Sequence, residues 1–478
     1  MLIQPFSSEC GAHKLRVTYT HSFDKLLGFK IADGDMTGIW PFIPSNSPIS
    51  LSHAEGAYLH LKDGKKILDA AGGAVVTNIG HGRSEVADAI HAATLNATYV
   101  VPPWLTPERE ALLEELRNYW LPQHLPCVHL CSGGSEANES AIKIAAQYQA
   151  AIGQPQRKLI LARNLSYHGT TISMAGLSGH ASRKRGIEPL LEDHPYIQTP
   201  YPLRCPLGPH HPDACQYYLQ DLEDTIQKLG SANIAALVAE PINGSSGGAI
   251  TPPAGYWQKA SEILQRHGIL LIMDEVMTGF GRTGTAFGSQ LYDVEPDLLV
   301  AGKGLAGGYA AIAGVFGRAD IANAIREGGF NVMFHTFGAL PQSCAAATAV
   351  LKILRDEDLV RRAGVIGQKT LERLQGTFGQ HPNVAEIRGA GMLIGIEIVK
   401  DRDSLERFDE GARVTDRLTS AAMNAGVFFY PGGTGEYRDV MCIGAPFIID
   451  EPEIELMETA LAAALADLPA SRARYNAL

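Results

Sequence analysis

The strongest constraint on the fold is an alternation of short apolar runs with helical patterns, from about residue 80 to about residue 320. The apolar runs have the length of buried strands and lie at Cys127–Leu130, Lys158–Ala162, Ala235–Ala239, Ile269–Met273, Leu298–Val300 and Ala313–Phe316. Helical periodicity separates them at Glu136–Ala151, Asp221–Leu229 and Tyr256–His267. This alternation is typical of βαβ units. It predicts an α/β fold whose large domain is a mostly parallel sheet between layers of helices.

The two ends of the chain predict a second, smaller α+β domain. Tyr58–Asp69 alternates around Asp63-Gly64, which indicates a β-hairpin. Long helices, two strands and a final helix are expected at 343–379, Gly389–Val399, Val440–Ile449 and Glu451–Leu468. A chain of 478 residues is long enough for two or three domains. We divide it into an N-terminal segment that joins the small domain (1–80), a large domain (81–335) and a C-terminal small domain (336–478).

The composition argues against several classes of partner. A net charge of −11 and a pI near 5.8 disfavour nucleic acids and anionic membranes as the main partners. We find neither an apolar stretch of about 20 residues nor the basic and apolar regions of a signal peptide. Seven cysteines, an odd number in a long chain, fit a reducing compartment. The expectation is a cytoplasmic protein that binds neither membrane nor nucleic acid.

Zinc is an alternative raised by the segment Cys205–Cys215, which contains both cysteines and histidines. The segment lacks the C-x₂-C and H-x₃-H pairs that are usual in zinc sites. A Pro-rich surface loop is therefore the preferred interpretation, and no metal site is expected.

Carboxylates follow two of the expected strands. Asp274 comes directly after Ile269–Met273, and Glu240 comes directly after Ala235–Ala239. Ligands of open parallel sheets bind at the carboxyl ends of the strands, so both residues are candidates for function. A buried carboxylate there either caps the next turn or favours the protonated form of a nearby pyridine nitrogen.

A lysine flanked by glycines follows the expected strand Leu298–Val300, in the order Ala301-Gly302-Lys303-Gly304. A solvated surface charge is a poor explanation for a lysine in this position. Partial burial keeps a lysine neutral and makes it a nucleophile for aldehydes. A phosphate-binding P-loop is excluded because Asp297 stands where that motif begins with glycine.

Two further segments offer groups for an anion or a flat ring. Cys131–Ala137 is rich in small residues and precedes a helix, so its backbone N–H groups can bind a phosphate. Its alternative role is an ordinary helix cap. Tyr167-His168 follows another strand, and an aromatic ring there either stacks on a planar ligand or packs in the core.

A nicotinamide-dependent oxidoreductase is the formal rival, because Gly279–Gly284 satisfies G-x-G-x-x-G. That fingerprint requires the glycines to open a helix directly after a strand. Here Asp274-Glu275 intervenes and Thr285–Ser289 is a poor helix. A non-catalytic binding protein fits less well still, given the strand-end lysine and carboxylates.

Taken together, the segments Leu271–Gly284 and Pro296–Gly308 resemble the signature D-E-V-x-x-G-F-G-R-T-G, P-D and K-G-L-x-G-G of the class III aminotransferases. These are enzymes of fold type I that use pyridoxal 5′-phosphate (PLP). The similarity covers about residues 55–450. It implies a seven-stranded, mostly parallel sheet in the large domain and a small domain built from both termini.

The resemblance also implies a role for each matching residue. Lys303 holds PLP as a Schiff base and moves the proton, Asp274 pairs with the ring nitrogen, and Glu240 lies near the phenolic oxygen. The remaining cofactor contacts implied are Gly134 and Ser135 at the phosphate, Tyr167, His168 and Val276 at the ring, and Thr336 at the phosphate of the neighbouring subunit. Thr336 thus implies a homodimer with shared active sites. The reaction implied is ping-pong transfer of an amino group from a primary amine or ω-amino donor to a keto acid such as pyruvate.

Two departures from the family bear on the substrate. Members that act on α-amino acids carry an R-x-x-P-P motif, whereas Cys442 and Ala445 occupy the arginine and first proline positions here. The ω-amine branch uses a mobile arginine upstream, for which Arg438 is the candidate; its alternative is a surface charge in a Gly-rich loop. Val75 replaces a tryptophan of that branch, which predicts a wider pocket and a bulky or long-chain primary amine.

The class also contains a 2,2-dialkylglycine decarboxylase, an aminomutase and racemases. They share every cofactor contact named above, so the sequence leaves them open as alternatives.

Overall fold

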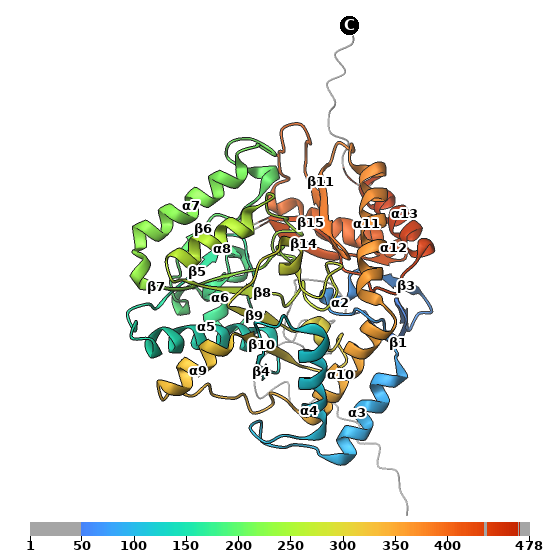
Figure 1. Cartoon of the computed structure of the whole chain (residues 1–478). Helices are drawn as coiled ribbons and strands as arrows, with labels where there is room; N and C mark the ends of the chain where they lie inside the picture. The colour runs from blue at the N-terminus through green and yellow to red at the C-terminus, as the bar shows by residue number, and fades with distance from the viewer. Residues whose placement is uncertain (1–48, 435–436, 467, 469–478) are drawn as a thin grey trace, which may run out of the picture. The chain divides into compact units, whose positions relative to one another are not determined.

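The structure is a computed structural model that describes residues 49–434, 437–466 and 468. The helices and strands described belong to the unit Leu51–Leu478 and include three sheets (Figure 1). Most of the predicted N-terminal segment, residues 1–48, lies outside the described residues.

The central sheet has seven strands in the order β4-β10-β9-β8-β7-β5-β6. Their bounds are β4 (Cys127–Cys131), β5 (Leu159–Arg163), β6 (Tyr196–Ile197), β7 (Ile234–Ala239), β8 (Leu270–Asp274), β9 (Leu298–Ala301) and β10 (Ala313–Gly317). Only β10 runs antiparallel to its two neighbours in this sheet, β4 and β9. The predicted α/β fold with a mostly parallel, seven-stranded sheet is confirmed.

Alternate side chains of the central strands enter two different hydrophobic cores. Val238 and Ile272 pack with α5 (Gly134–Ala151), α6 (Ile172–Leu177) and α9 (Ala319–Glu327). Their neighbours Leu237 and Leu271 point to the opposite face and pack with α7 (Ala214–Leu229) and α8 (Tyr256–Arg266). Because side chains alternate along a strand, apolar residues at every position give a sheet covered on both faces. Figure 1 shows α7 and α8 on one side of the sheet and α5 and α9 on the other.

A third group of helices covers the edge of the large domain near β4. The long helix α10 (Pro341–Asp356) contacts both α3 (Ser84–Asn96) and α4 (Pro107–Glu115). α4 begins at Pro107, and the Oγ1 atom of the preceding Thr106 accepts the N–H of Arg109. Both features favour a helix start at this point. A single π-helical turn (Leu116–Trp120) follows α4.

The small domain contains two sheets of four strands. One has the order β11-β12-β15-β14, with bounds β11 (Val384–Ala390), β12 (Leu393–Ile398), β14 (Tyr430–Thr434) and β15 (Tyr437–Ile443). The other has the order β1-β2-β3-β13, with bounds β1 (Leu51–Glu55), β2 (Tyr58–Leu61), β3 (Lys66–Asp69) and β13 (Val427–Phe428). The helices of this part are α11 (Leu359–Phe378), α12 (Val414–Asn424) and α13 (Glu451–Ala466). Since β13 pairs with β3, residues from both ends of the sequence share one sheet, as expected.

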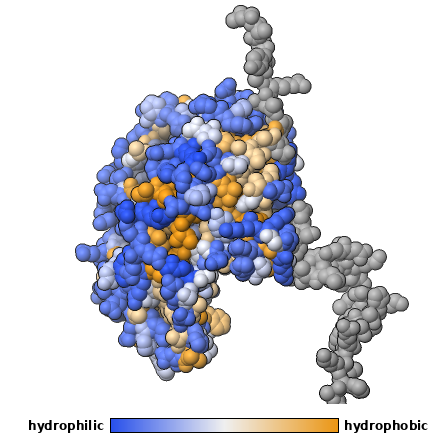
Figure 2. All heavy atoms as spheres, turned by 90° about the vertical axis from the view of Figure 1, so that its right-hand side faces the viewer, coloured by the Kyte–Doolittle hydropathy of each residue, from blue (hydrophilic) through white to orange (hydrophobic). Residues whose placement is uncertain are grey.

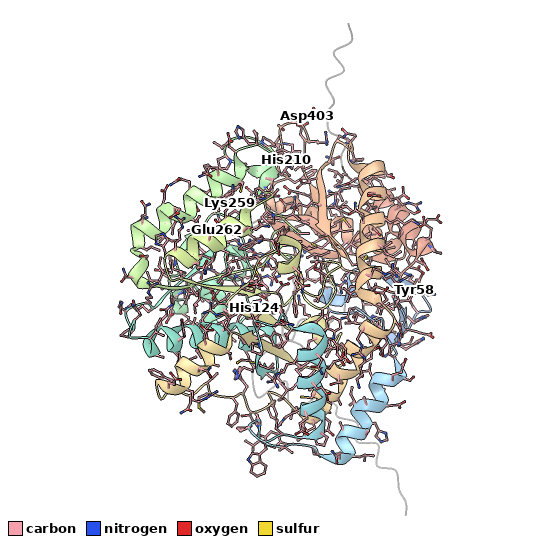
Figure 3. All side chains as sticks on the ribbon, viewed as in Figure 1. Tyr58, His124, His210, Lys259, Glu262 and Asp403 are labelled. Carbon is pink, nitrogen blue, oxygen red and sulfur yellow. The ribbon has the colours of Figure 1, made fainter. Side chains whose placement is uncertain are left out.

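Two polar contacts tie distant parts of the sequence together, and Figure 3 labels one residue of each, Tyr58 and His210. The hydroxyl of Tyr58 donates to Oε1 of Glu453 at 2.8 Å, which joins β2 to α13. Nε2 of His210 lies 3.3 Å from Oε1 of Glu386, which joins the segment before α7 to β11. The exact domain boundaries given above stay predictions.

Several elements differ in detail from the sequence-based expectation. Gly389–Val399 is not one strand, because the chain reverses at Gly391, whose φ of +52° is readily available to glycine. β15 ends at Ile443, short of the predicted Ile449, and the strand β6 was not predicted. In the described ranges, every helix is too short or too polar to span a bilayer.

Candidate active site

A cavity of about 280 Å³ lies at the carboxyl ends of the central strands. The turns after β4, β5, β7, β8 and β9 all contribute to its lining. Of the residues predicted from the sequence, the structure brings together Gly134, Ser135, Tyr167, His168, Glu240, Asp274, Val276 and Lys303 in this lining. The strand-end rule therefore located the cavity correctly.

Lys303 follows β9 and opens a short 3₁₀ turn, Lys303–Leu305. Its φ of +39° lies in the left-handed region, which costs a non-glycine residue roughly 1–3 kcal/mol. Burial lowers the pKa of Lys303 to about 8, and the charges of Asp274 and Glu240 limit the shift. A substantial fraction of this lysine is thus a neutral amine near pH 8. Its backbone is placed by the glycine that follows, since a Cβ on Gly304 would lie 3.2 Å from the carbonyl oxygen of Gly279.

The carboxylate of Asp274 is buried at the end of β8 and accepts three hydrogen bonds. Oδ2 accepts from Nδ2 of Asn138 at 2.9 Å and lies 2.7 Å from Nδ1 of His168. Oδ1 accepts from the backbone N–H of Val276 at 3.0 Å. With an ionised Asp274, which only accepts, Nδ1 of His168 is the donor in this contact. The carboxylate is fixed in position and faces the cavity.

Glu240 begins the turn after β7 and is also buried. Its Oε1 accepts the backbone N–H of Tyr167 at 3.2 Å, and its Oε2 accepts the backbone N–H of Gly244 at 2.6 Å. Burial raises the pKa of this carboxyl above its usual value. Glu240 therefore joins the turns after β5 and β7 and places a proton-binding group beside Lys303.

The N-terminus of α5 forms a cradle with free backbone N–H groups and small side chains. Gly133 is the N-cap, and a Cβ on Gly134 would come within 3.0 Å of Cγ1 of Val276. Oγ of Ser135 accepts the N–H of Thr170 at 3.1 Å, which fixes the neighbouring turn. The start of a long helix with unpaired N–H groups suits an anion such as a phosphate.

Comparison with known proteins gives the family. The family model "Aminotransferase class-III" matches residues 43–465. The chain belongs to the class III aminotransferases. It is 34% identical to the putrescine–pyruvate aminotransferase of Pseudomonas aeruginosa, over 86% of this chain and 88% of that protein. It is 33% identical to the vanillin aminotransferase of Capsicum annuum, over 76% of this chain and 80% of that protein.

Solved structures give the same result for the fold. An amine transaminase from an uncultivated Pseudomonas species, solved in its PLP-bound form, superimposes with a TM-score of 0.85 at 34% identity. The match covers 90% of this chain and 99% of that protein. An (S)-enantioselective ω-transaminase from Thermomicrobium roseum superimposes with a TM-score of 0.83 at 34% identity, over 88% and 93% of the two chains. This aminotransferase therefore has the α/β fold that its sequence predicted, and it shares this fold with solved transaminases.

The structure does not bring three of the predicted residues into the cavity. Val75 is buried in a small apolar cluster with Ile242, and it is Val76 that lines the cavity. Arg438 lies in β15 and pairs with Asp416 of α12, with 3.3 Å between Nη2 and Oδ1. Thr336 lies in an exposed turn. Their predicted roles stay predictions.

Sequence reasoning missed residues that hold the cavity-lining side chains in position. Asn138 is the clearest example, since its Nδ2 binds both Asp274 and the carbonyl oxygen of His168. A polar residue on the buried face of α5 was the available signal. Glu275 turns away from the cavity and accepts the N–H groups of Gly288 and Ser289 at 2.7 and 2.6 Å. It is a structural carboxylate next to Asp274, which lines the cavity.

The glycines that imitated a dinucleotide fingerprint have a packing role in this aminotransferase. They lie in turns after β8 and open no helix. A Cβ on Gly284 would come within 2.7 Å of the Cα atom of Gly364, so α11 approaches this turn closely. Arg282, which lies between two of these glycines in the sequence, is buried. It donates to the carbonyl oxygens of Thr77, Gly444 and Ala445 at 2.7–2.8 Å. The segment thus joins the large and small domains.

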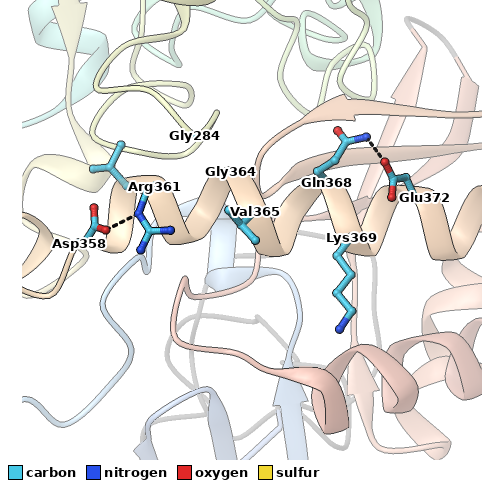
Figure 4. A pocket seen from close by; sticks show the side chains of 9 residues that line it. Gly284, Asp358, Arg361, Gly364, Val365, Gln368, Lys369 and Glu372 are labelled. Carbon is cyan, nitrogen blue, oxygen red and sulfur yellow. Dashed lines mark hydrogen bonds and ion pairs between the residues drawn. The ribbon is translucent and has the colours of Figure 1, made fainter.

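A larger hollow, of about 690 Å³, lies along α11 and carries no comparable chemistry (Figure 4). Asp358 pairs with Arg361, and Gln368 donates to Glu372 at 2.7 Å. Lys369 pairs with Glu451 of α13. The polar groups around this hollow are exposed and have partners within the hollow or on α13.

Two groups of side chains within the described ranges have the composition of a metal site. Ligand atoms lie within 4.8 Å of one another in the groups His129, Cys131 and His335, and His53, Glu55 and His60. Cys205 and Cys215 belong to neither group. The absence of a metal stays a prediction.

Proposed function

We propose that this aminotransferase uses PLP to transfer an amino group from a carboxylate-free primary amine to a keto acid such as pyruvate. The observation that carries the proposal is the position of Lys303, a buried lysine of lowered pKa between the carboxylates of Asp274 and Glu240. A neutral amine in this position is a nucleophile for an aldehyde and a base for a carbon-bound proton.

The lining fits PLP part by part. The start of α5 would hold the phosphate, Asp274 would pair with the ring nitrogen, and Lys303 would bind the aldehyde carbon; all of these groups line the cavity. Val276 and Tyr167 offer apolar surfaces for a planar ring. When bound, PLP supplies an electrophilic aldehyde and an electron-accepting pyridinium ring.

Three side chains of the protein would have separate roles in the reaction. Asp274 would hold a proton at the ring nitrogen, because a fixed buried anion favours the charged form of its neighbour. Lys303 would take a proton from the substrate carbon and return it to the former aldehyde carbon of the cofactor. Glu240 holds the turns around Lys303 in place through two backbone N–H groups.

The rest of the lining supports an amine donor with an apolar body. Val76, Ile242, Met277 and Ile312 contribute apolar surface, and no arginine lines the cavity among the described residues. Cys442, at the position of the arginine that binds α-carboxylates in other members, is buried. The related proteins whose names include putrescine and vanillin point to similar amine chemistry.

A panel of donors tests this proposal. Hexylamine and putrescine are expected to convert the bound cofactor to its amine form, and pyruvate is expected to restore the aldehyde form. The absorbance of the cofactor measures both conversions. Lys303→Ala, the matched control, is expected to do neither. Conversion by only glutamate and 4-aminobutyrate would refute the donor class, and release of CO₂ or racemisation without transfer would refute the reaction.

A homodimer with shared active sites is part of the proposal. Figure 2 shows apolar side chains gathered within an otherwise hydrophilic surface. Large hydrophobic side chains are exposed near Thr336, namely Met333, Phe334 and Phe337, and others at Trp104 and Leu105. Arg109 links the two segments by donating to the carbonyl oxygens of Val101 and Ala339. Exposed apolar surface of this kind is typical of an interface.

Sedimentation of the purified protein tests the dimer, and PLP affinity tests the shared site. Thr336→Ala is expected to weaken PLP binding without dissociating the dimer. A monomer that binds PLP tightly would refute both parts.

A further inference from the structure

Two imidazoles and a thiol meet at the edge of the central sheet, outside the lining of the active-site cavity. His129 and Cys131 belong to β4, the last strand at one end of the sheet, and His335 directly precedes the turn that contains Thr336. Because side chains alternate along a strand, His129 and Cys131 point to the same face, where Cys131 packs with α5. The ligand atoms of the three residues lie within 4.8 Å of one another.

α5 provides polar partners for this cluster of His129, Cys131 and His335. Oγ of Ser140 lies 3.1 Å from Nε2 of His335 and 3.7 Å from Sγ of Cys131. On the other side of the same ring, Nδ1 of His335 lies 3.7 Å from Oε1 of Glu136. A histidine that binds a metal usually directs its second nitrogen toward a carboxylate or carbonyl group. The helix thus places an oxygen beside the cluster and a carboxylate behind one of its imidazoles.

His129 contributes a ring nitrogen that is free to bind a ligand. Its Nε2 atom is buried and makes no hydrogen bond with the residues that the structure describes. A buried polar atom without a partner costs free energy, which a ligand at this position would recover. Burial, together with the charge of His335, lowers the pKa of His129 to about 4, so the ring is neutral at pH 7. A neutral imidazole is the form that binds metals.

A cavity of about 320 Å³ gives an ion a path to the cluster. His129 lines it together with residues of α9 and the segment 330–332. Arg326, Phe330 and Asn331 belong to the same lining and are exposed, so the cavity is open at the surface.

We propose that His129, Cys131 and His335 bind a zinc ion. Histidine nitrogens and cysteine thiolates are usual ligands of Zn²⁺, at about 2.0–2.1 Å and 2.3 Å. In a tetrahedral site these bond lengths separate the ligand atoms by roughly 3.3–3.6 Å, so movements of about 1 Å close the cluster. Burial raises the pKa of the Cys131 thiol to about 11, and zinc therefore displaces a proton from Sγ when it binds.

This proposal replaces the sequence-based expectation of no metal site. That expectation rested on the segment Cys205–Cys215, and neither of those cysteines belongs to the cluster. The ion would join β4, which leads to the start of α5, to the segment that carries Thr336. The proposal is independent of amino-group transfer, and it is tested without an activity assay.

Cobalt substitution tests the ligand set in the wild-type protein. The full chain, purified without a histidine tag and freed of metal by a chelator, is titrated with Co²⁺. We expect saturation at one ion per chain, with the strong visible absorption of tetrahedral cobalt and a thiolate-to-cobalt charge-transfer band. Displacement of the cobalt by Zn²⁺ is expected to remove both features. A wild-type protein that shows no thiolate band would overturn the proposal, and this result needs no variant that folds.

Zinc affinities of variants, measured by competition with a chromogenic chelator, identify the ligands. Loss of an outer-shell partner costs about 10–100-fold in metal affinity, so Cys131→Ser and His335→Ala are expected to lose about 100-fold or more. Cys127→Ser is the matched control, because Cys127 lies on the same face of β4 and outside the cluster. It is expected to bind zinc within about threefold of wild type.

His60→Ala tests the other candidate group, which contains His53, Glu55 and His60. It is expected to leave the tight zinc site unchanged. Loss of zinc binding in His60→Ala but not in Cys131→Ser would overturn the proposal, as would equal affinities of the wild type and Cys131→Ser.

Discussion

Asp274 and His168 form a buried pair in which Oδ2 lies 2.7 Å from Nδ1. Asp274 is the last residue of β8, His168 lies in the turn after β5, and Asn138 of α5 donates to the same Oδ2 atom. Three elements of the large domain therefore meet at one carboxylate oxygen. This leaves the other oxygen, Oδ1, held by a single backbone N–H and directed toward the cavity.

Asp274→Asn removes the anion and keeps the shape of the side chain. We expect kcat to fall by roughly 10²–10³-fold, the usual effect of removing a preorganised charge at a reacting group. Single-turnover absorbance with hexylamine measures the loss. A kcat within about threefold of wild type would contradict the role of Asp274.

Asn138→Ala removes one hydrogen bond to Asp274 and leaves the charge in place. The expected loss in PLP affinity corresponds to about 1–3 kcal/mol, because a buried acceptor loses a partner. Equilibrium titration with PLP gives this value. If affinity is unchanged, the contact between Asn138 and Asp274 does not position the carboxylate.

The lowered pKa of Lys303 predicts the pH dependence of cofactor uptake. Only the neutral amine reacts with an aldehyde, and the pKa of Lys303 in the folded protein is about 8 against an ordinary value near 10.5. The rate of PLP incorporation into cofactor-free protein is thus expected to rise with pH, with a midpoint near 8. Because the unfolded chain binds more protons between pH 8 and 10.5, this lysine also makes the cofactor-free fold more stable as pH rises through that window. Stopped-flow absorbance measures this rate. A pH midpoint near 10 for the rate of PLP incorporation would show that Lys303 is not shielded from water.

Arg282→Met tests the link between the large and small domains. Three buried carbonyl oxygens lose a charged donor, so the free energy of unfolding is expected to fall by about 3 kcal/mol or more. Urea denaturation followed by circular dichroism measures it. Arg361→Gln, an exposed arginine, is expected to stay within about 0.5 kcal/mol of wild type; equal effects of both changes would contradict the structural role of Arg282.

Val76 gives a direct test of donor size, because its side chain lines the cavity. Val76→Leu is expected to lower kcat/KM for a bulky amine about tenfold more than for a small one, and Val76→Ala is expected to do the reverse. Paired assays with 1-phenylethylamine and ethylamine measure the difference. Parallel changes for both donors would indicate that Val76 does not limit the pocket.

The central sheet and the cavity were predictable because burial on two faces requires continuous apolar strands. Asp274, Glu240 and Lys303 stand directly after such strands, so their clustering followed from the position of strand ends. Side-chain partners were less accessible to sequence reasoning. The role of Asn138 depends on the rotation of α5 about its axis, and the motif containing Arg282 does not reveal that its carbonyl partners come from both ends of the chain.

Local backbone geometry explains two further differences from the sequence-based expectation. The sequence placed Val75 at the pocket, yet its φ of +58° turns the chain so that Val76 faces the cavity. A β-branched residue in that region is unusual, and no pattern in the sequence announces it. Similarly, Gly391 reverses a stretch that has the composition of a single strand.

Borohydride reduction of the PLP-treated protein, followed by peptide mass spectrometry, is the most direct test of the central claim. The account predicts one covalently attached cofactor per chain, on Nζ of Lys303. A protein that takes up no PLP, or one in which the label is found on a different lysine, would contradict it.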